Sequence, residues 1–155
     1  MKYFSTKRYG NDRGLSCCFR QWRSTHSHCS LLHGYSIGVK VVFGCETLDE
    51  RNWVYDFGGL KEFKEWLEFM FDHTLVIAED DPKRAEFEAL AIAGAADVRI
   101  VPAVGCERFA ELAFKKLESL LEKYKKENTI LNNTAYIYSV EVFEHDANSA
   151  IVTKE

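Results

Sequence analysis

Alternating apolar and polar side chains mark two long segments of this sequence as β-strands. Residues 34–45 and 134–144 change side with every residue and are rich in β-branched and aromatic side chains, a period typical of strands. Residues 150–153 form a further short strand after the turn-like sequence Asp-Ala-Asn-Ser, which predicts a closing hairpin. Residues 15–22 are a fourth strand candidate.

Apolar residues at helical spacing predict two long helices. The first follows Asp56 and a pair of glycines and carries apolar residues at positions 60, 63, 67 and 70. The second is Cys106–Lys126, with Glu107 in its first turn and lysines in its last, as the helix dipole favours. Residues 82–94 predict a short extra helix, and residues 97–101 predict a short strand.

The predicted order is strand, strand, helix, helix, strand, strand. It indicates an α+β fold whose antiparallel sheet is covered by helices on one face. The strands carry apolar residues toward the other face as well, so the free edges favour association of subunits edge to edge. The sequence has only two prolines and no low-complexity segment. We therefore expect residues 1–155 to form a single domain.

Composition excludes several classes of function. Lys and Arg number 20 against 24 Asp and Glu, a net charge of −4, so we expect no nucleic-acid partner. No apolar run approaches the ~18 residues of a membrane span, and residues 1–11 lack the apolar core of a signal peptide. Five cysteines, an odd count, argue against a disulfide framework. We therefore expect a cytoplasmic protein with free thiols, of which Cys45 and Cys106 have structural roles.

Residues 26–35 hold the densest cluster of candidate ligands. Three of the five histidines and Cys29 lie within it, and His33 and Tyr35, two apart on a predicted strand, project to the same side. Such spacing suits a tetrahedral metal site, although tyrosine is a rare zinc ligand. The alternative is a polar loop with solvated histidines.

Two further groups are candidates for chemistry. Asp72 and His73 end the first predicted helix, and a carboxylate beside an imidazole is a common way to tune a general base. The alternative is a histidine stabilised by the negative end of the helix dipole. Glu144 ends the strand at 134–144, where its carboxylate either lines a pocket or is an ordinary strand-end acid.

Together these clusters resemble the 6-pyruvoyl-tetrahydropterin synthase family, which includes the 6-carboxytetrahydropterin synthases of queuosine and 7-deazaguanine biosynthesis. Five segments resemble family motifs in the same order along the chain. They are residues 29–35 (Cys-x-x-x-His-Gly-His), 54–61 (V-x-D-F-x-x-L-K), 71–73 (Leu-Asp-His), 102–110 (Pro-Thr-x-Glu-Asn) and the closing hairpin from 140 to 154.

The resemblance implies a tunnelling fold (T-fold), a four-stranded antiparallel sheet with two helices on one face in ββααββ order. It also implies homo-oligomers, trimers or hexamers, with active sites between subunits and 7,8-dihydroneopterin triphosphate as substrate. In such a site Cys29 is the acid/base thiol, and Asp72 and His73 assist it from a neighbouring subunit. Glu144 accepts hydrogen bonds from the pterin, and Glu107 helps to line the pocket.

The resemblance further implies a zinc cofactor held by three histidines, and here the sequence departs from the pattern. Only His33 matches; Tyr35 replaces one histidine, and the first-strand ligand falls on Cys18 or Phe19, depending on a one-residue gap. Either the metal site is rebuilt from His33 with Cys18 or His28, or the metal is lost.

Two hypotheses about function follow. The first is a pterin-processing lyase of the 6-carboxytetrahydropterin synthase type, with 6-pyruvoyl chemistry left open. The alternative is a non-catalytic pterin- or purine-binding protein that has lost the family zinc site. Residues 20–23, which include two arginines, either contact a phosphate or form a solvated loop.

Overall fold

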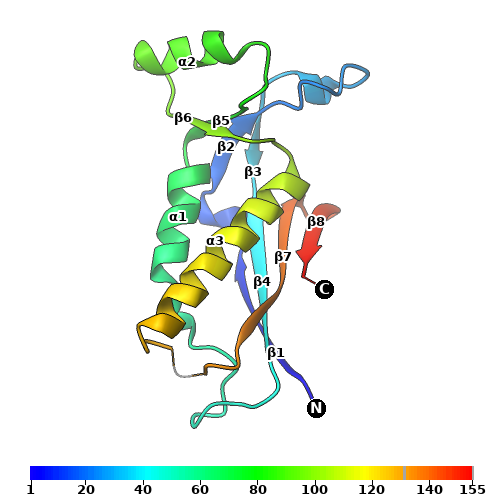
Figure 1. Cartoon of the computed structure of the whole chain (residues 1–155). Helices are drawn as coiled ribbons and strands as arrows, with labels where there is room; N and C mark the ends of the chain where they lie inside the picture. Colours follow the sequence, from blue (N-terminus) through cyan, green and yellow to red (C-terminus); the bar gives the residue numbers. More distant parts are fainter. Residues whose placement is uncertain (131, 155) are drawn as a thin grey trace.

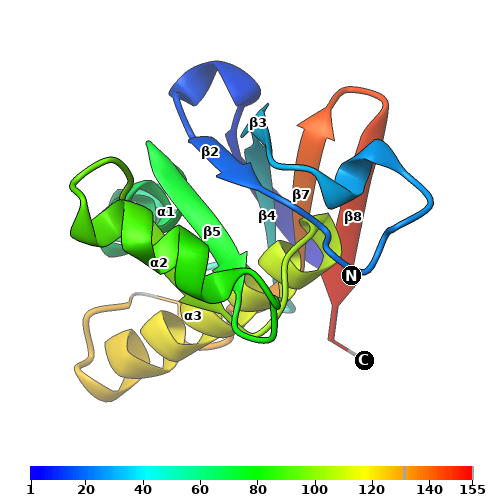
Figure 2. The ribbon, with the colours of Figure 1, turned by 90° about the horizontal axis from the view of Figure 1, so that it is seen from above.

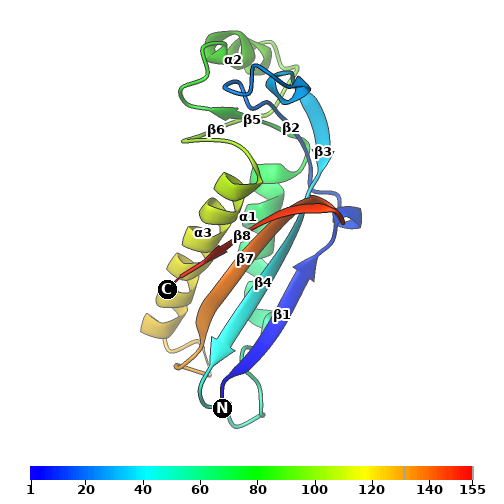
Figure 3. The same cartoon turned by 90° about the vertical axis from the view of Figure 1, so that its right-hand side faces the viewer.

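The computed structural model describes residues 1–130 and 132–154 (Figure 1). Its main sheet has the strand order β1-β4-β7-β8, and every neighbouring pair is antiparallel. These strands are β1 (Tyr3–Tyr9), β4 (Gly38–Cys45), β7 (Tyr136–His145) and β8 (Asn148–Thr153). Helices α1 (Lys61–Phe71) and α3 (Cys106–Lys126) lie along one face of this sheet (Figure 3).

A second, smaller sheet has the strand order β3-β2-β5-β6. Its strands are β2 (Ser16–Phe19), β3 (His33–Ser36), β5 (Thr74–Ala78) and β6 (Val98–Val101). β2 is antiparallel to β3 and parallel to β5, and β5 is parallel to β6. Helix α2 (Arg84–Ile92) packs against β5 and β6 (Figure 2). The short 3-10 helices are η1 (Asn11–Arg13), η2 (His28–Ser30) and η3 (Phe57–Leu60).

The apolar stripes of α1 and α3 explain why both helices pack on the main sheet. Both stripes are buried at helical spacing; they include Phe63, Leu67, Phe71, Phe109, Ala113 and Leu117. Burial of one large apolar side chain contributes roughly 1.5–3 kcal/mol relative to exposure. Phe109, in the first turns of α3, also meets the ring of Phe19 at the end of β2. The start of α3 is thereby fixed between the two sheets.

The segment predicted as one strand at 34–45 is two strands in different sheets. Ile37 separates β3 from β4, is fully buried, and donates its N–H to the carbonyl of Leu15. Gly38 follows, and a Cβ at this position would lie 2.1 Å from the ring of Phe143. Only glycine therefore fits where the chain passes from the small sheet into the main one.

Two strands are missing from the sequence-based prediction. β1 is polar and mostly exposed, so its alternation is weak, whereas all five residues of β5 are buried and show no alternation. The candidate at 15–22 is a strand, but it is β2 of the smaller sheet, and β1 takes the place beside β4. The helices at 82–94 and 106–126 and the strands at 97–101, 134–144 and 150–153 are confirmed, with small shifts of their ends.

Within the described ranges, no helix combines the length and the apolar character that crossing a membrane requires. The five cysteines are free.

Candidate active site

The pairing of β2 with β3 decides which side chains share a face at the predicted metal cluster. Phe19 lies opposite His33, and Cys17 lies opposite Tyr35. Residues directly opposite in an antiparallel pair project to the same side, and successive residues alternate. Phe19, His33 and Tyr35 therefore share one face, and Cys18, opposite Gly34, projects to the other.

The rings on this shared face are packed against one another. Phe19 and Tyr35 are stacked, with centroids 4.0 Å apart and planes inclined by 13°. The ring of His33 lies 4.5 Å from that of Tyr35, and its Nδ1 is 2.9 Å from the carbonyl oxygen of Leu31. Phe19 is fully buried, and its edge meets Phe109 at 4.9 Å. The place where the resemblance implies a zinc ligand set is thus occupied by stacked rings.

The chain does not bring the predicted metal ligands together. Cys18 cannot join His33, because a one-residue step along β2 turns its side chain to the opposite face. His28 lies exposed in η2. Across residues 1–130 and 132–154, no three His, Cys, Asp or Glu side chains form a group suited to a metal ion. Within one subunit, Cys18, His28 and His33 therefore do not fit the zinc site that the resemblance implies.

Glu144 sits at an irregularity near the end of β7. Phe143 pairs with Ser149 and His145 with Asn148, so Glu144 is the extra residue of a β-bulge. The side-chain amide of Asn11 holds the backbone there, because it donates to the carbonyls of Phe143 (3.3 Å), Glu144 (3.1 Å) and Ser36 (2.6 Å). A bulge turns a side chain away from the regular alternation. Here it holds the half-buried carboxylate of Glu144 beside β3.

Two side chains, Cys106 and Tyr35, lie close to this carboxylate. Burial raises the pKa of the Cys106 thiol to about 12, and the nearby charges of Glu144 and Glu107 add to the effect. Burial likewise raises the pKa of Tyr35 to about 12, with further contributions from Glu144 and Cys29. Both groups are therefore neutral at pH 7 and stand beside Glu144 as possible hydrogen-bond donors. The sequence analysis gave Cys106 a structural role and did not place it near Glu144, because nothing in a linear pattern brings the start of α3 beside the end of β7.

Cys29 lies half-buried in η2, on a loop tied to the end of β2. Its N–H donates to Ser27 Oγ at 3.2 Å, and its carbonyl accepts from the N–H of Gln21 at 2.7 Å. The guanidinium of Arg20 donates to the carbonyl of the next residue, Ser30, at 3.2 Å.

Arg20 also forms a two-pronged ion pair with Asp81. The two N···O distances are 2.9 and 2.6 Å, and the side chain of Asp81 is 1% exposed. Burial alone raises the pKa of Asp81, but hydrogen bonds from Arg20 and from the backbone of Lys83 outweigh it and leave the pKa lowered. Arg23 pairs with Asp80 at the surface, where its side chain is 73% exposed, as the solvated-loop alternative expects. Arg20 differs, because its carboxylate partner is buried.

Asp72 and His73 lie close to each other but far from Cys29 of the same chain. His73 Nδ1 is 2.5 Å from Asp72 Oδ1, and the side chain of His73 is 86% exposed. The His73 N–H donates to the carbonyl of Ser16, at the start of β2. The carbonyl of Cys29 accepts from the N–H of Gln21, beyond the end of β2. These anchor points are five residues apart on extended chain, roughly 16 Å. Within one subunit the dyad and the thiol therefore occupy different places.

Gln21 and Glu107 both approach Gly105, the residue before α3. Gly105 has a φ of 116°, which favours glycine. A Cβ built on it would lie 3.5 Å from Gln21 Nε2 and 3.6 Å from Glu107 Oε2. Glu107 is exposed, and it lies near both the loop that carries Cys29 and the thiol of Cys106.

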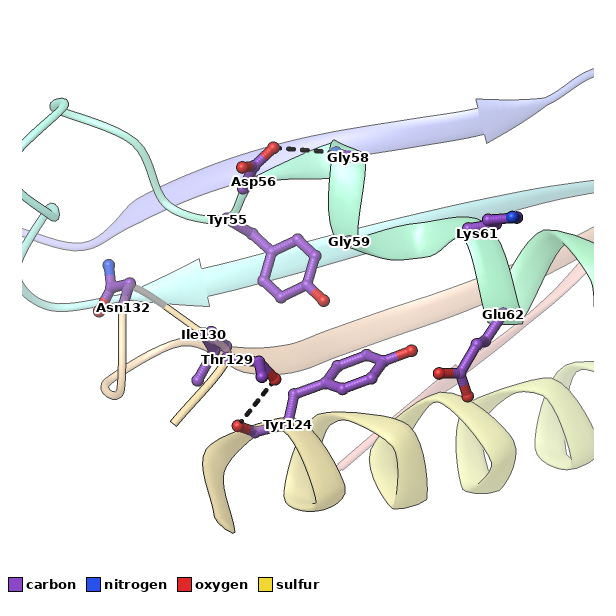
Figure 4. A pocket seen from close by; sticks show the side chains of 10 residues that line it. All are labelled: Tyr55, Asp56, Gly58, Gly59, Lys61, Glu62, Tyr124, Thr129, Ile130 and Asn132. Carbon is purple, nitrogen blue, oxygen red and sulfur yellow. Dashed lines mark hydrogen bonds between the residues drawn. The ribbon is translucent and has the colours of Figure 1, made fainter. Parts of the chain in front are cut away.

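A separate pocket of about 300 Å³ lies between η3 and the end of α3 (Figure 4). Its walls include Tyr55, Glu62 and Tyr124, and Asp56 accepts a hydrogen bond from the N–H of Gly58 at 2.9 Å. The residues that line it include none of the predicted site residues. This pocket is therefore distinct from the convergence of side chains at Glu144.

Comparison with known sequences relates the chain to pterin enzymes. A sequence model of the family described as 6-pyruvoyl tetrahydropterin synthase matches residues 11–155. A curated relative from Aquifex aeolicus (strain VF5), named 6-carboxy-5,6,7,8-tetrahydropterin synthase, is 32% identical over 98 residues, 61% of this chain and 60% of that protein. A relative of the same name from Rickettsia bellii (strain RML369-C) is 33% identical over 54 residues, 34% of this chain and 39% of that protein. The match spans less than two thirds of either relative.

Comparison with solved structures confirms the tunnelling fold. An uncharacterized protein from Wolinella succinogenes superposes with a TM-score of 0.79 at 20% identity, covering 100% of this chain and 99% of that one. The 6-pyruvoyl tetrahydropterin synthase of Plasmodium falciparum superposes with a TM-score of 0.64 at 16% identity, covering 99% of this chain and 98% of that one. At these identities the likeness concerns the fold alone.

Proposed function

The chain belongs to the 6-pyruvoyl tetrahydropterin synthase family, and from this membership we propose that it binds a pterin and processes it by proton transfer. The proposed substrate is 7,8-dihydroneopterin triphosphate, and the proposed reaction is a lyase reaction of the 6-carboxytetrahydropterin synthase type. The names of the two curated relatives support this choice.

The observation that supports the proposal is the position of Glu144 in the bulge of β7, next to Tyr35 and Cys106. A carboxylate accepts two parallel hydrogen bonds and so matches the ring N–H and the 2-amino group of a pterin. Tyr35, a neutral donor beside that carboxylate, is proposed to bind an acceptor atom of the same ring. Glu144 is therefore the proposed anchor for the substrate.

The proposed acid–base groups are Cys29 and the pair of Asp72 with His73. Asp72 accepts a hydrogen bond from His73 Nδ1, which leaves Nε2 free to take a proton. Because this pair is remote from Cys29 within one chain, we propose that it completes the site of a neighbouring subunit in a homo-oligomer. The part of the chain that the structure describes does not group the ligands of the family's zinc site, so no step here is assigned to a metal.

The setting of this activity follows from the same residues. We propose that residues 1–155 act as one domain and that the protein works in the cytoplasm, a compartment that keeps cysteines reduced. The five free cysteines support this assignment.

A turnover assay tests the proposal. The oligomer is incubated with 7,8-dihydroneopterin triphosphate, with and without added zinc, and products are identified by liquid chromatography and mass spectrometry. We expect a 6-substituted tetrahydropterin product that is lost in Cys29→Ala. Absence of any product in both arms, from folded protein, would contradict the lyase proposal.

A second candidate function is pterin or purine binding without turnover. The observation that favours it is the presence of Phe19 and Tyr35 where the resemblance implies histidines. This candidate predicts saturable binding that requires Glu144 and no product in either arm of the assay.

A further inference from the structure

A continuous series of aromatic rings connects the hydrophobic core to the face where the resemblance implies zinc. The centroid distances are 5.0 Å from Phe71 to Phe109, 4.9 Å from Phe109 to Phe19, 4.0 Å from Phe19 to Tyr35 and 4.5 Å from Tyr35 to His33. We refer to these five rings as the aromatic ladder. It begins under α1 and α3 and ends at the surface on β3.

The ladder occupies three of the four side-chain positions that share one face of β2 and β3, and Cys17 occupies the fourth. Phe19 and His33 are directly opposite, and Tyr35 is the next residue on the same face. A protein zinc site requires three ligands when catalytic and four when structural, each with a lone pair free for the metal. Phe19 has no such donor, and it is fully buried beneath Tyr35. His33 is the one imidazole on this face.

We propose that the ladder has replaced the family's zinc site, so that this chain holds and processes its pterin with hydrogen-bond donors and an aromatic surface instead of a zinc ion. The inference deepens the proposed function and rests on it in one respect, that the pterin binds at Glu144. In this arrangement Tyr35 supplies a hydroxyl donor to the pterin, because its ring is fixed by Phe19 while it stands beside Glu144 and Cys29.

The positions of Cys17 and Cys18 on β2 also explain why these cysteines do not rebuild the zinc site. Cys18 faces away from the ladder because of the register of β2. Cys17 does lie on the ladder's face, opposite Tyr35, but its side chain is buried in the hydrophobic core.

Zinc content per chain is the test, because it needs no activity. The wild-type protein, His33→Ala and the double variant Phe19→His with Tyr35→His are purified after growth with added zinc and analysed by elemental mass spectrometry. We expect the wild type and His33→Ala to carry the same low amount. The double variant places three imidazoles on one face and is expected to carry about one zinc per chain.

A matched control separates this face from the number of histidines added. The double variant Cys18→His with Tyr35→His also adds two imidazoles, but one of them points to the opposite face of β2. We expect it to carry no more zinc than the wild type. Equal zinc in the two double variants would overturn the assignment of the site to the ladder's face.

Two results would overturn the proposal directly. One is about one zinc per wild-type chain that is lost in His33→Ala, and the other is a folded double variant at positions 19 and 35 that gains none. If that variant fails to fold because Phe19 is buried, the comparison of the wild type with His33→Ala still decides. The same low zinc content in both supports the proposal, and zinc that His33→Ala loses overturns it.

The test is distinguishable from failure of the proposed function. A zinc-free wild type that converts no substrate supports the ladder inference and contradicts the lyase proposal. A wild type with zinc at His33 that converts substrate supports the lyase and overturns the inference.

Discussion

Glu144 is the extra residue of the bulge in β7. The variant Glu144→Gln tests its proposed role as the anchor for the pterin. Glu144→Gln keeps the size of the side chain but turns one acceptor into a donor. We expect pterin affinity to fall about 10- to 100-fold, which corresponds to about 1.5–3 kcal/mol for hydrogen bonds to a charged group. Isothermal titration calorimetry with a pterin measures this loss.

Glu141→Gln is the control for that experiment. Glu141 lies on the same strand and is also half-buried, and it is opposite Lys40 of the neighbouring strand β4. We expect its substitution to leave pterin affinity unchanged. Equal losses in the two variants would mean that Glu144 acts through net charge and not as an anchor.

The cysteines differ in exposure, which predicts an order of chemical modification. Cys17, Cys45 and Cys106 are buried, and the pKa values of Cys17 and Cys106 are raised to about 12, mainly by burial. Cys18 is half-exposed, but burial raises its pKa as well. Because only the thiolate reacts, we expect iodoacetamide at neutral pH to modify Cys29 first and Cys18 more slowly. Peptide mass spectrometry gives the order, and early loss of Cys106 would contradict it.

At the scale of single residues, sequence reasoning found several side chains but not their directions. Cys29 and Glu144 were predicted from motifs, and the structure places both near Tyr35. The choice between Cys18 and Phe19 was open, because a shift of one residue along a strand exchanges its two faces. Only the register with β3 settles which of them faces His33.

The loop that carries Cys29 depends on the ion pair between Arg20 and Asp81. Breaking a buried pair leaves one charge without its partner and typically costs about 3 kcal/mol or more. We therefore expect Asp81→Ala to lower the free energy of unfolding by about 3 kcal/mol, as measured by urea denaturation at pH 7. Asp80→Ala is the control, because Asp80 forms an exposed pair in the same turn, and we expect little change.

Acid should remove the contribution of Asp81. Its pKa is lowered in the folded chain, so the folded state binds this proton less readily than the unfolded state does. The stabilisation is then complete above the unfolded pKa of about 4 and is lost as the pH falls through the folded value. We expect the difference between wild type and Asp81→Ala to shrink in urea titrations below pH 4. A difference that stays constant down to pH 2.5 would contradict this assignment.

At the scale of elements, the sequence predicted helices better than strands. The helix at Cys106–Lys126 was predicted with its observed bounds, because its apolar stripe and terminal charges agree. The strand prediction failed where two sheets share one segment, since Ile37 and Gly38 continue the alternation while the chain changes partners. Pairing between distant strands is a tertiary property, and a local period does not contain it.

The separation of Cys29 from Asp72 and His73 is a property of the whole molecule. If each site takes its thiol from one subunit and its dyad from the next, two inactive variants complement each other. We expect Cys29→Ala and His73→Ala to be inactive alone. Random mixing of equal amounts should restore about a quarter of the wild-type activity, because about one interface in four receives both intact groups.

The mixing experiment needs a control for simple association. Equal mixtures of Cys29→Ala with Cys29→Ser, refolded and re-associated in the same way, are expected to stay inactive. Native mass spectrometry checks that the subunits have exchanged. Exchange without recovery in the first mixture would show that the thiol and the dyad do not share a site.

The full burial of Phe19 has a consequence for the history of this chain. A single change to histidine at position 19 would place a polar ring among Tyr35 and Phe109 without a hydrogen-bond partner, at a cost of roughly 1–3 kcal/mol. A single change at position 35 would provide only two imidazoles, one fewer than catalytic zinc requires. Neither substitution alone restores a zinc site. A return to zinc binding at this face therefore requires both substitutions together.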